Sequence, residues 1–282
     1  MRIRCIALDL DKTTLNSEGH LSERNRKAME QAIKSGIQIA VASGRSLDSL
    51  PGAVLEIPGI RYAITSNGAA VYDLKEKVCL RQYKLKAEAV RDILRETEGE
   101  DVTFEAFIDG KPYAEKAYVE DPVRFGAMPQ SIPYIQGTRK PIPDMREFIG
   151  KHAEELDCID VVVKSEEHKQ RLWKTLEKCV RDVYITSSVK QLLEISDVNA
   201  GKDAAAEFLI GYLGMSREEL AGFGDGHNDR GLLKYAGIGF AVENASVECR
   251  EAADRIVASN DEDGIAEGIE YILKVNAADR EF

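Results

Sequence analysis

Short apolar runs alternate with amphipathic stretches at both ends of the chain, and this pattern predicts strands separated by helices. Nearly continuous apolar runs are typical of strands buried on both faces, as in a parallel sheet with helices on each side. A helix fits between the first two runs, because Ser22 can cap its start and Gly36 its end. The predicted strands lie at residues 2–8, 37–43, 61–68, 220–224, 237–242 and 255–258.

The middle of the chain follows a different pattern. Residues 69–83 are predicted to form a hairpin, and a loop that holds five of the eight prolines interrupts the segment after residue 121. Short strands on both sides of this loop favour antiparallel pairing and an α+β arrangement. We therefore expect a Rossmann-like α/β core made of residues 1–82 and 196–282, with an inserted α+β cap domain at residues 83–195. Besides the hairpin, the elements expected in the middle are strands near 102–108, 112–118, 158–164, 183–187 and 191–195 and helices near 86–98 and 166–180.

Composition and charge narrow the class of protein. The 282 residues, 44% of them apolar and 31% charged, are those of a globular protein of one large or two ordinary domains. No apolar stretch approaches the roughly 20 residues that span a bilayer, and the N-terminus lacks the layout of a signal peptide. The expected location is therefore the cytoplasm. A net charge of −11 argues against nucleic acid or an anionic membrane as partner.

The cysteines and histidines give no sign of a soft metal site. The five cysteines form no C-x-x-C pair, and the histidines form no H-E-x-x-H motif. The pattern predicts scattered reduced thiols, with neither a disulfide framework nor a zinc site. Any bound metal is expected to have oxygen ligands.

Polar residues gather where the predicted strands end and where one helix begins. The segments are residues 9–13 (DLDKT), 42–45 (ASGR), 201–203 (GKD) and 224–229 (GDGHND). In open α/β sheets, ligands bind at the carboxyl ends of the strands. We therefore expect these four segments, distant in sequence, to meet in one crevice.

Four carboxylates in such a crevice require a cation. Asp9, Asp11, Asp225 and Asp229 cannot all stay ionised together without one, or some of their pKa values would rise. Oxygen ligands without paired histidine or cysteine select a hard cation, and Mg²⁺ fits best because it accepts a few carboxylates together with water and phosphate.

The remaining polar groups predict phosphoryl transfer. Lys202 supplies a permanent positive charge, while Ser43, Asn228 and the amides near Gly44 supply neutral donors. Two aspartates at i and i+2 on an extended segment point to the same side. One can attack phosphorus while the other protonates the leaving group and later activates water.

As a set, the motifs "DLDKTTLN", "ASGR", "TSNGA", "GKDAA" and "GDGHND" resemble those of the haloacid dehalogenase-like hydrolases. The long insert between the second and third of the catalytic segments is similar to the Cof-type branch with its C2-type cap. The resemblance covers the whole chain. It departs from the common pattern at Lys12, where many relatives have glycine, and at Gly201 and Asp203, where the motif often reads Ser-Lys-Gly.

The resemblance implies a Mg²⁺-dependent phosphatase whose substrates are small phosphorylated metabolites, sugar phosphates foremost. By the family pattern, Asp9 is the nucleophile and a metal ligand, and Asp11 is the acid/base, with its main-chain carbonyl on the metal. Ser43 and Lys202 hold the phosphoryl oxygens, Asp225 binds Mg²⁺ and Asp229 supports it. The implied substrate-binding residues are Ser43, Gly44, Arg45, Asn67, Lys202 and Asn228, although Asn67-Gly68 is by itself first a tight-turn signal.

Two other functions use the same chemistry. A phosphomutase or phosphotransferase would pass the phosphoryl group from the aspartate to a sugar instead of water. A receiver-like signalling protein would store the phosphoaspartate, but such a protein needs about one ordinary domain and no large insert. A second aspartate two residues after the nucleophile also favours turnover over storage.

Overall fold

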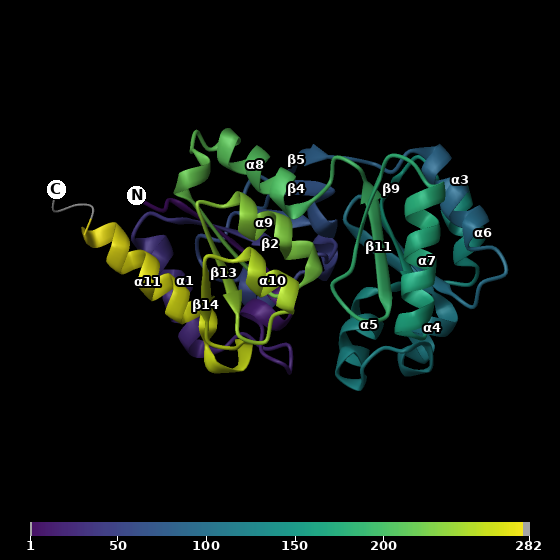
Figure 1. Ribbon diagram of the computed structural model, residues 1–282, viewed down its shortest axis with the longest axis horizontal. Coiled ribbons are helices and arrows are strands. Elements are labelled where there is room, and N and C mark those ends of the chain that lie inside the picture. The colour runs from purple at the N-terminus through teal and green to yellow at the C-terminus, as the bar shows by residue number, and fades with distance from the viewer. Residues whose placement is uncertain (1, 279–282) are drawn as a thin grey trace. The chain divides into compact units, whose positions relative to one another are not determined.

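The structure, a computed structural model, describes residues 2–278, which divide into two compact units. The first contains the chain up to Gly44, Leu50–Arg81 and the part from Gly201 onward, and the second contains Arg45–Ser49 and Gln82–Ala200. In Figure 1 the first unit runs from purple to blue up to Arg81 and from green to yellow after Gly201, and the second runs mostly from blue through teal to green. The short segment Arg45–Ser49 thus groups with the insert and not, as expected, with the core.

The first unit is built on an eight-stranded sheet with the order β14-β13-β12-β1-β2-β3-β4-β5. The pairs from β14 to β3 are parallel, and β3 and β4 are antiparallel. Its strands are β1 (Cys5–Leu8), β2 (Gln38–Ala42), β3 (Tyr62–Thr65), β4 (Ala70–Asp73), β5 (Val78–Gln82), β12 (Leu220–Gly224), β13 (Ile238–Val242) and β14 (Arg255–Val257). Its helices are α1 (Glu23–Lys34), α2 (Gly52–Leu55), α8 (Lys202–Tyr212), α9 (Arg230–Tyr235), α10 (Val247–Ala252) and α11 (Gly264–Ala278).

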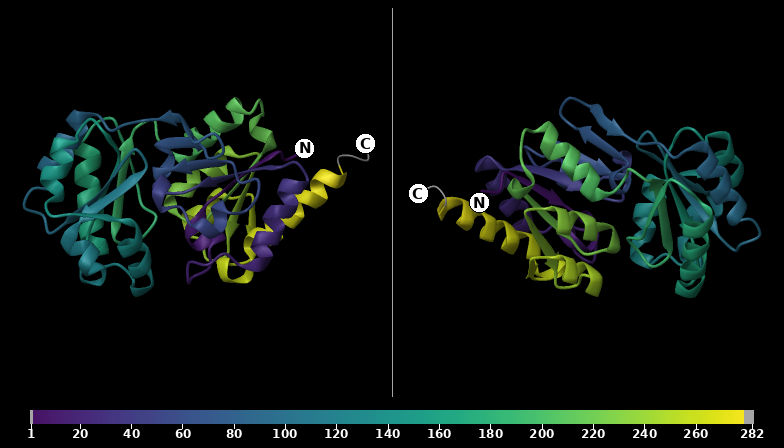
Figure 2. Two further views of the ribbon diagram at one scale, coloured as in Figure 1. Left: turned by 180° about the vertical axis from the view of Figure 1, so that it is seen from behind. Right: turned by 45° about the horizontal axis from the view of Figure 1, so that its top comes forward.

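Helices cover this sheet on both faces because its central strands are apolar on both. In β1, Cys5 and Ala7 pack with residues of α8 and α9, and the alternation of a strand turns Ile6 and Leu8 to the opposite face. There α1 and α11 pack side by side (Figures 1 and 2). The predicted parallel sheet is therefore confirmed.

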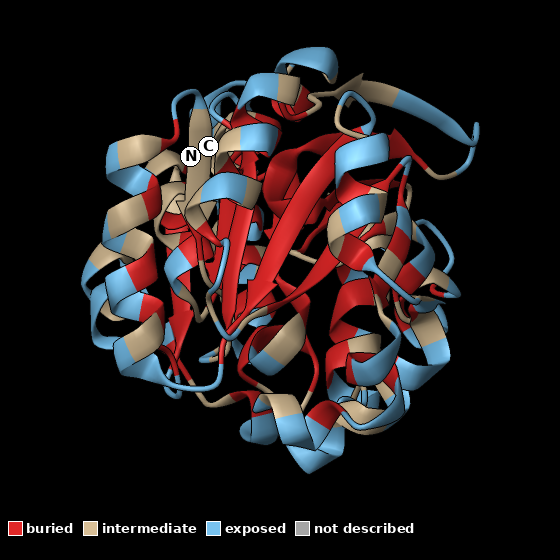
Figure 3. Ribbon diagram, turned by 90° about the vertical axis from the view of Figure 1, so that its right-hand side faces the viewer, coloured by how far each residue is buried: buried red, intermediate tan, exposed pale blue. Residues whose placement is uncertain are grey.

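The second unit is built on a six-stranded sheet with the order β10-β11-β9-β6-β7-β8. Only β7 and β8 are parallel among its described pairs. Residues of α3, α6 and α7 cover one face, and α4 and α5 contribute to a smaller apolar cluster on the other. The central strands β6, β9 and β11 are buried throughout, and Figure 3 shows buried strands behind helices whose outer sides are exposed. The elements are α3 (Ala87–Glu96), β6 (Thr103–Ile108), β7 (Lys111–Glu115), α4 (Lys116–Glu120), α5 (Ile132–Thr138), β8 (Lys140–Ile142), α6 (Met145–Lys151), β9 (Leu156–Val162), α7 (Glu166–Cys179), β10 (Val183–Thr186) and β11 (Leu192–Asp197).

The structure corrects the expected elements around the proline-rich segment. The strand predicted at 112–118 ends at Glu115, and a short helix follows it directly. The expected loop contains 3₁₀ turns at Pro122–Phe125 and Pro129–Ser131 and the helix α5. Each of these three begins with a proline in its first two positions, where the missing N–H has no intrahelical partner to lose.

The helix α6 was not expected, although the sequence carries its start signal. The side chain of Asp144 accepts a hydrogen bond from the N–H of Glu147 at 2.9 Å. An acidic cap followed three residues later by glutamate is a common helix start. The helix has only 7 residues, so its apolar positions do not repeat often enough to indicate a helix from the sequence.

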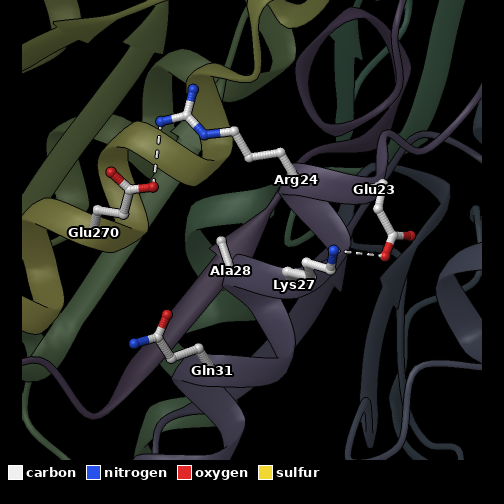
Figure 4. A pocket seen from close by; sticks show the side chains of 6 residues that line it. All are labelled: Glu23, Arg24, Lys27, Ala28, Gln31 and Glu270. Carbon is white, nitrogen blue, oxygen red and sulfur yellow. Dashed lines mark hydrogen bonds and ion pairs between the residues drawn. The ribbon is translucent and has the colours of Figure 1, made fainter.

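Two further surface features complete the description. Among residues 2–278, no helix combines the length and apolar character that crossing a bilayer requires. A shallow groove runs between α1 and α11 (Figure 4), and none of the sequence-predicted site residues lines it. The residues that line it are Glu23, Arg24, Lys27, Ala28, Gln31 and Glu270.

Two neighbouring positions of α11 test how the first unit is held together. Ile269 is fully buried, so Ile269→Ala should lower the free energy of unfolding by about 2–5 kcal/mol. Glu270 is about half exposed and pairs with Arg24 at 3.2 Å, so Glu270→Ala should cost less than about 1 kcal/mol. Denaturant unfolding of both variants measures the difference. Equal losses would contradict the assignment of α11 to the core.

Candidate active site

The carboxyl ends of neighbouring parallel strands bring the first two aspartates together. Asp9 follows β1, and its N–H donates to the carbonyl of Phe223 in β12 at 3.1 Å. Asp225 follows the end of β12, which pairs with β1 in parallel. Both carboxylates therefore leave the same edge of the sheet, as the strand pattern predicts.

Lys202 is the centre of the site. Its Nζ donates to Oδ1 of Asp9 at 2.7 Å and to Oδ1 of Asp229 at 2.6 Å, and its side chain has no solvent exposure. Oxygens of Asp9, Asp225 and Asp229 all lie within 4.8 Å of one another. Three carboxylates around one ammonium leave an excess of two negative charges, if all are ionised.

The loop after β12 holds Asp229 against the sheet. Oδ2 of Asp229 accepts hydrogen bonds from the N–H groups of Asp225 at 3.0 Å and Gly226 at 2.9 Å. A Cβ on Gly224 would lie 2.3 Å from the Cβ of Asp229, so only glycine allows this approach. Asp229 thus orients both its own loop and Lys202, a double role that the motif alone does not reveal.

Burial and mutual repulsion shift the pKa values of this group. Burial raises the pKa of Asp9 well above its usual range, despite the attraction of Lys202, and repulsion from Asp229 and Asp225 adds to the rise. Burial, with repulsion from Asp229, raises the pKa of Asp225 to about 7. Burial disfavours the charged form of Lys202, but Asp229 and Asp9 outweigh it, so its pKa is raised and it stays protonated.

The group fits a hard divalent cation. A cation would remove the repulsion that raises the pKa values of Asp9 and Asp225, and the available ligand atoms are carboxylate oxygens. The hydroxyl of Thr13 donates to Oδ1 of Asp225 at 3.0 Å and fixes how that carboxylate is turned. Sequence reasoning did not single out Thr13 for this contact, although it stands in the first motif.

Asp11 lies in the turn that follows Asp9. Its carboxylate is not part of the three-carboxylate group, and the ligand expected from it is the main-chain carbonyl. Lys12, next in the chain, has a left-handed backbone with φ of 60°. This conformation favours glycine, which accounts for the glycine that many relatives have here, and the lysine of this chain adopts the same conformation at some cost.

The loop that contains Asn67 is hydrogen-bonded to both Ser43 and Asn228, and all three residues lie in the first unit. Ser43 is buried at the end of β2, where its carbonyl accepts the N–H of Asn67 at 3.1 Å. Asn228, also buried, donates from Nδ2 to Oδ1 of Asn67 at 2.9 Å. The carbonyl of Asn67 accepts the N–H of Gly201, which precedes Lys202, at 2.9 Å.

Gly44 and Arg45 fall on different sides of the division between the units. Gly44 closes the first stretch of the first unit, whereas Arg45 belongs to the second. There the Arg45 guanidinium lies 4.1 Å from the ring centroid of Tyr134 and donates to the carbonyl of Ser49 at 3.1 Å. The N–H of Asp48 donates to Gly110, which fastens this segment to the insert. The role of Arg45 toward substrate stays a prediction.

A family profile for haloacid dehalogenase-like hydrolases matches residues 6–269, so the chain belongs to that family. The resemblance inferred from its motifs, including the Cof-type branch, is confirmed. The enzyme is thus a haloacid dehalogenase-like phosphatase.

Known relatives match almost the whole chain. The 5-amino-6-(5-phospho-D-ribitylamino)uracil phosphatase YwtE of Bacillus subtilis (strain 168) is 28% identical, over 96% of this chain and 98% of its own. Phosphatase YwpJ of the same strain is 29% identical over 96% of this chain and 100% of its own. The solved structure of a haloacid dehalogenase-like hydrolase from B. subtilis, 28% identical, matches with a TM-score of 0.80 over 95% of this chain and 99% of that one.

Two glycines with similar backbones test the close contact beneath Lys202. Gly68 has φ of +94°, and a Cβ there would lie 2.1 Å from the carbonyl oxygen of Gly201. Gly36 has φ of +88°, but a Cβ there would meet nothing within 4 Å. Gly36→Ala should cost about 1–2 kcal/mol of stability from its backbone alone. Gly68→Ala should cost clearly more in denaturant unfolding, and an equal cost would mean that the two loops separate without penalty.

The raised carboxylate pKa values predict how stability depends on pH in protein stripped of metal by a chelator. The native state holds protons that the unfolded chain releases, because the pKa of Asp225 moves from its ordinary 3.8 to about 7. This stabilisation is complete below the ordinary value and is lost as pH rises through about 7. The thermal unfolding midpoint should therefore fall between pH 5 and 8 by less in Asp225→Asn than in the unchanged protein. Parallel curves would contradict the prediction.

Proposed function

We propose that this enzyme is a Mg²⁺-dependent phosphatase that hydrolyses small phosphorylated metabolites, sugar phosphates foremost, through a phosphoaspartate on Asp9. The observation that carries the proposal is the buried Lys202 ammonium between Asp9 and Asp229, with Asp225 beside them. Such a site offers a nucleophile, a fixed positive charge and ligands for a divalent cation within one small volume.

The first half of the reaction forms the bond between an Asp9 oxygen and phosphorus and breaks the bond between phosphorus and the leaving oxygen. Lys202 holds Oδ1 of Asp9 and so restricts the rotation of the nucleophile. Because Lys202 stays protonated, it also offers positive charge to the phosphoryl oxygens. Asp11 gives its proton to the leaving alkoxide.

The second half returns Asp9 to its starting state. Asp11, now ionised, takes a proton from water, whose oxygen attacks phosphorus and releases inorganic phosphate with Asp9 as the leaving carboxylate. Ser43, the amide of Gly44 and Asn228 donate to the phosphoryl oxygens. Mg²⁺, held by Asp9 and Asp225, by the main-chain carbonyl of Asp11 and with support from Asp229, would supply charge neutralisation for the phosphoryl group.

In this proposal, the inserted cap at residues 83–195 and Arg45 select the leaving group. The relative YwtE acts, by its name, on 5-amino-6-(5-phospho-D-ribitylamino)uracil, in which the phosphate is carried on a ribityl chain. This likeness supports a polyhydroxyl leaving group for the present enzyme. A screen of phosphorylated sugars, sugar alcohols and unrelated phosphate esters with Mg²⁺ would rank these classes.

Asp9→Asn tests the nucleophile. With Mg²⁺, the unchanged enzyme should release phosphate from an aryl phosphate, whereas Asp9→Asn should lose at least about 10³-fold in kcat, because an amide cannot form the phosphoenzyme. Glu270→Ala, an exposed change on α11, serves as the control and should keep full activity.

Two outcomes would overturn parts of this scheme. Equal phosphate release by the unchanged enzyme and Asp9→Asn would remove Asp9 from the mechanism. Phosphate release that appears only when a sugar acceptor is added would make the enzyme a phosphotransferase instead.

A further inference from the structure

Asn67 contacts three separate segments of the active site at once. Its N–H donates to the carbonyl of Ser43, its carbonyl accepts from the N–H of Gly201, and its Oδ1 accepts from Nδ2 of Asn228. The three distances are 3.1, 2.9 and 2.9 Å, and Asn67 is 1% exposed. In the proposed function, Ser43 and Asn228 are two of the groups that bind the phosphoryl oxygens. Gly201 directly precedes a third, Lys202.

The backbone of this turn is bent to make these contacts. Ser66, Asn67 and Gly68 have φ values of 49°, 53° and 94°, so three consecutive residues are left-handed. Residues other than glycine adopt this conformation at a cost, which asparagine bears better than most. The conformation turns the N–H of Asn67 toward Ser43 and its carbonyl toward Gly201.

A second residue braces the same turn against the helix that carries Lys202. Arg81 donates from Nη2 to the carbonyl of Gly68 at 3.3 Å and from Nη1 to the carbonyl of Ala204 at 2.9 Å. Gly68 also packs directly on the peptide of Gly201. Two hydrogen bonds from one side chain and a close packing contact therefore join the turn to the first residues of α8.

The side-chain contact determines the orientation of the Asn228 carboxamide. An acceptor at Oδ1 of Asn67 requires that Asn228 present its NH₂ group on that side. Because the carboxamide is planar, this contact also fixes the direction of the second hydrogen of the same NH₂ group. Without the acceptor, the amide of Asn228 could turn over and present its oxygen, which would repel a phosphoryl oxygen.

We propose that Asn67 is a positioning residue that acts on the phosphoryl group through Asn228, with its main chain setting the spacing of Ser43 and Lys202, and that it does not itself contact substrate. This inference rests on the proposed function. It replaces, for Asn67, the direct substrate contact that the family resemblance implies.

The test is a double-mutant cycle built on Asn67→Gly and Asn228→Ala. Glycine keeps the left-handed backbone and removes only the side chain. We expect Asn67→Gly to lower kcat/KM about ten-fold, the size expected when one buried hydrogen bond is lost. Asn228→Ala should lose at least as much, and the double variant should lose no more than Asn228→Ala alone.

A binding measurement separates positioning from general loss of structure. Calorimetric titration of each Mg²⁺-loaded variant with inorganic phosphate should show weaker binding in Asn67→Gly and Asn228→Ala and no further weakening in the double variant. Lys77→Gly, at an exposed left-handed residue with φ of 55°, is the matched control and should behave like the unchanged enzyme. Unfolding midpoints of all four variants identify any that are globally destabilised.

The outcomes distinguish this inference from the function on which it rests. Losses that multiply in the double variant would mean that the Asn67 side chain acts independently of Asn228, which would overturn the proposed route, and an Asn67→Gly enzyme with unchanged kcat/KM and phosphate affinity would refute its role. In both cases phosphatase activity that depends on Asp9 would still stand. An unchanged enzyme that neither hydrolyses phosphate esters nor binds phosphate would remove both proposals.

Discussion

The ion pairs that Lys202 makes with Asp9 and Asp229 are the interaction on which the rest of the structure depends. Burying an ammonium group is costly unless carboxylates meet it with good hydrogen-bond geometry, and here two do so at 2.7 and 2.6 Å. The partners come from the end of the first strand, the start of α8 and the loop after β12. The sheet order, the glycine at position 224 and the left-handed turn at Asn67 can all be understood as means of bringing these three groups together.

Much of this arrangement could be predicted from the sequence, because two simple regularities govern it. Nearly continuous apolar runs identified the parallel strands, and polar residues at the ends of those runs identified the groups that meet. The proline-rich part of the insert was harder to predict. Proline disfavours the interior of helices but suits their first turn, so three of the five prolines that suggested a loop stand at the start of α5 and of two 3₁₀ turns.

Within the site, the sequence identified the charged residues better than the contacts among them. Asp225 and Asp229 are four positions apart in one loop. Nothing in that spacing shows that the carboxylate of Asp229 accepts hydrogen bonds from the N–H groups of Asp225 and Gly226. Thr13 and Asn67 act through neighbours that are distant in the chain, so a linear pattern gives no sign of their partners. Arg45 is the last residue of the motif that contains Ser43, yet its stacking on Tyr134 depends on a helix that the sequence pattern did not predict.

The position of β1 in its sheet has a consequence for protein synthesis. Cys5 pairs with Leu220 as well as with Gln38, so the first strand gains one of its two neighbours only after most of the polypeptide has left the ribosome. The residues of the insert, in contrast, emerge as one nearly unbroken stretch before that point. A partly translated molecule therefore carries the aspartate at position 9 without the lysine that orients it. The ion pairs that hold Asp9 in the folded protein can therefore form only late in synthesis, once Lys202 and then Asp229 have emerged.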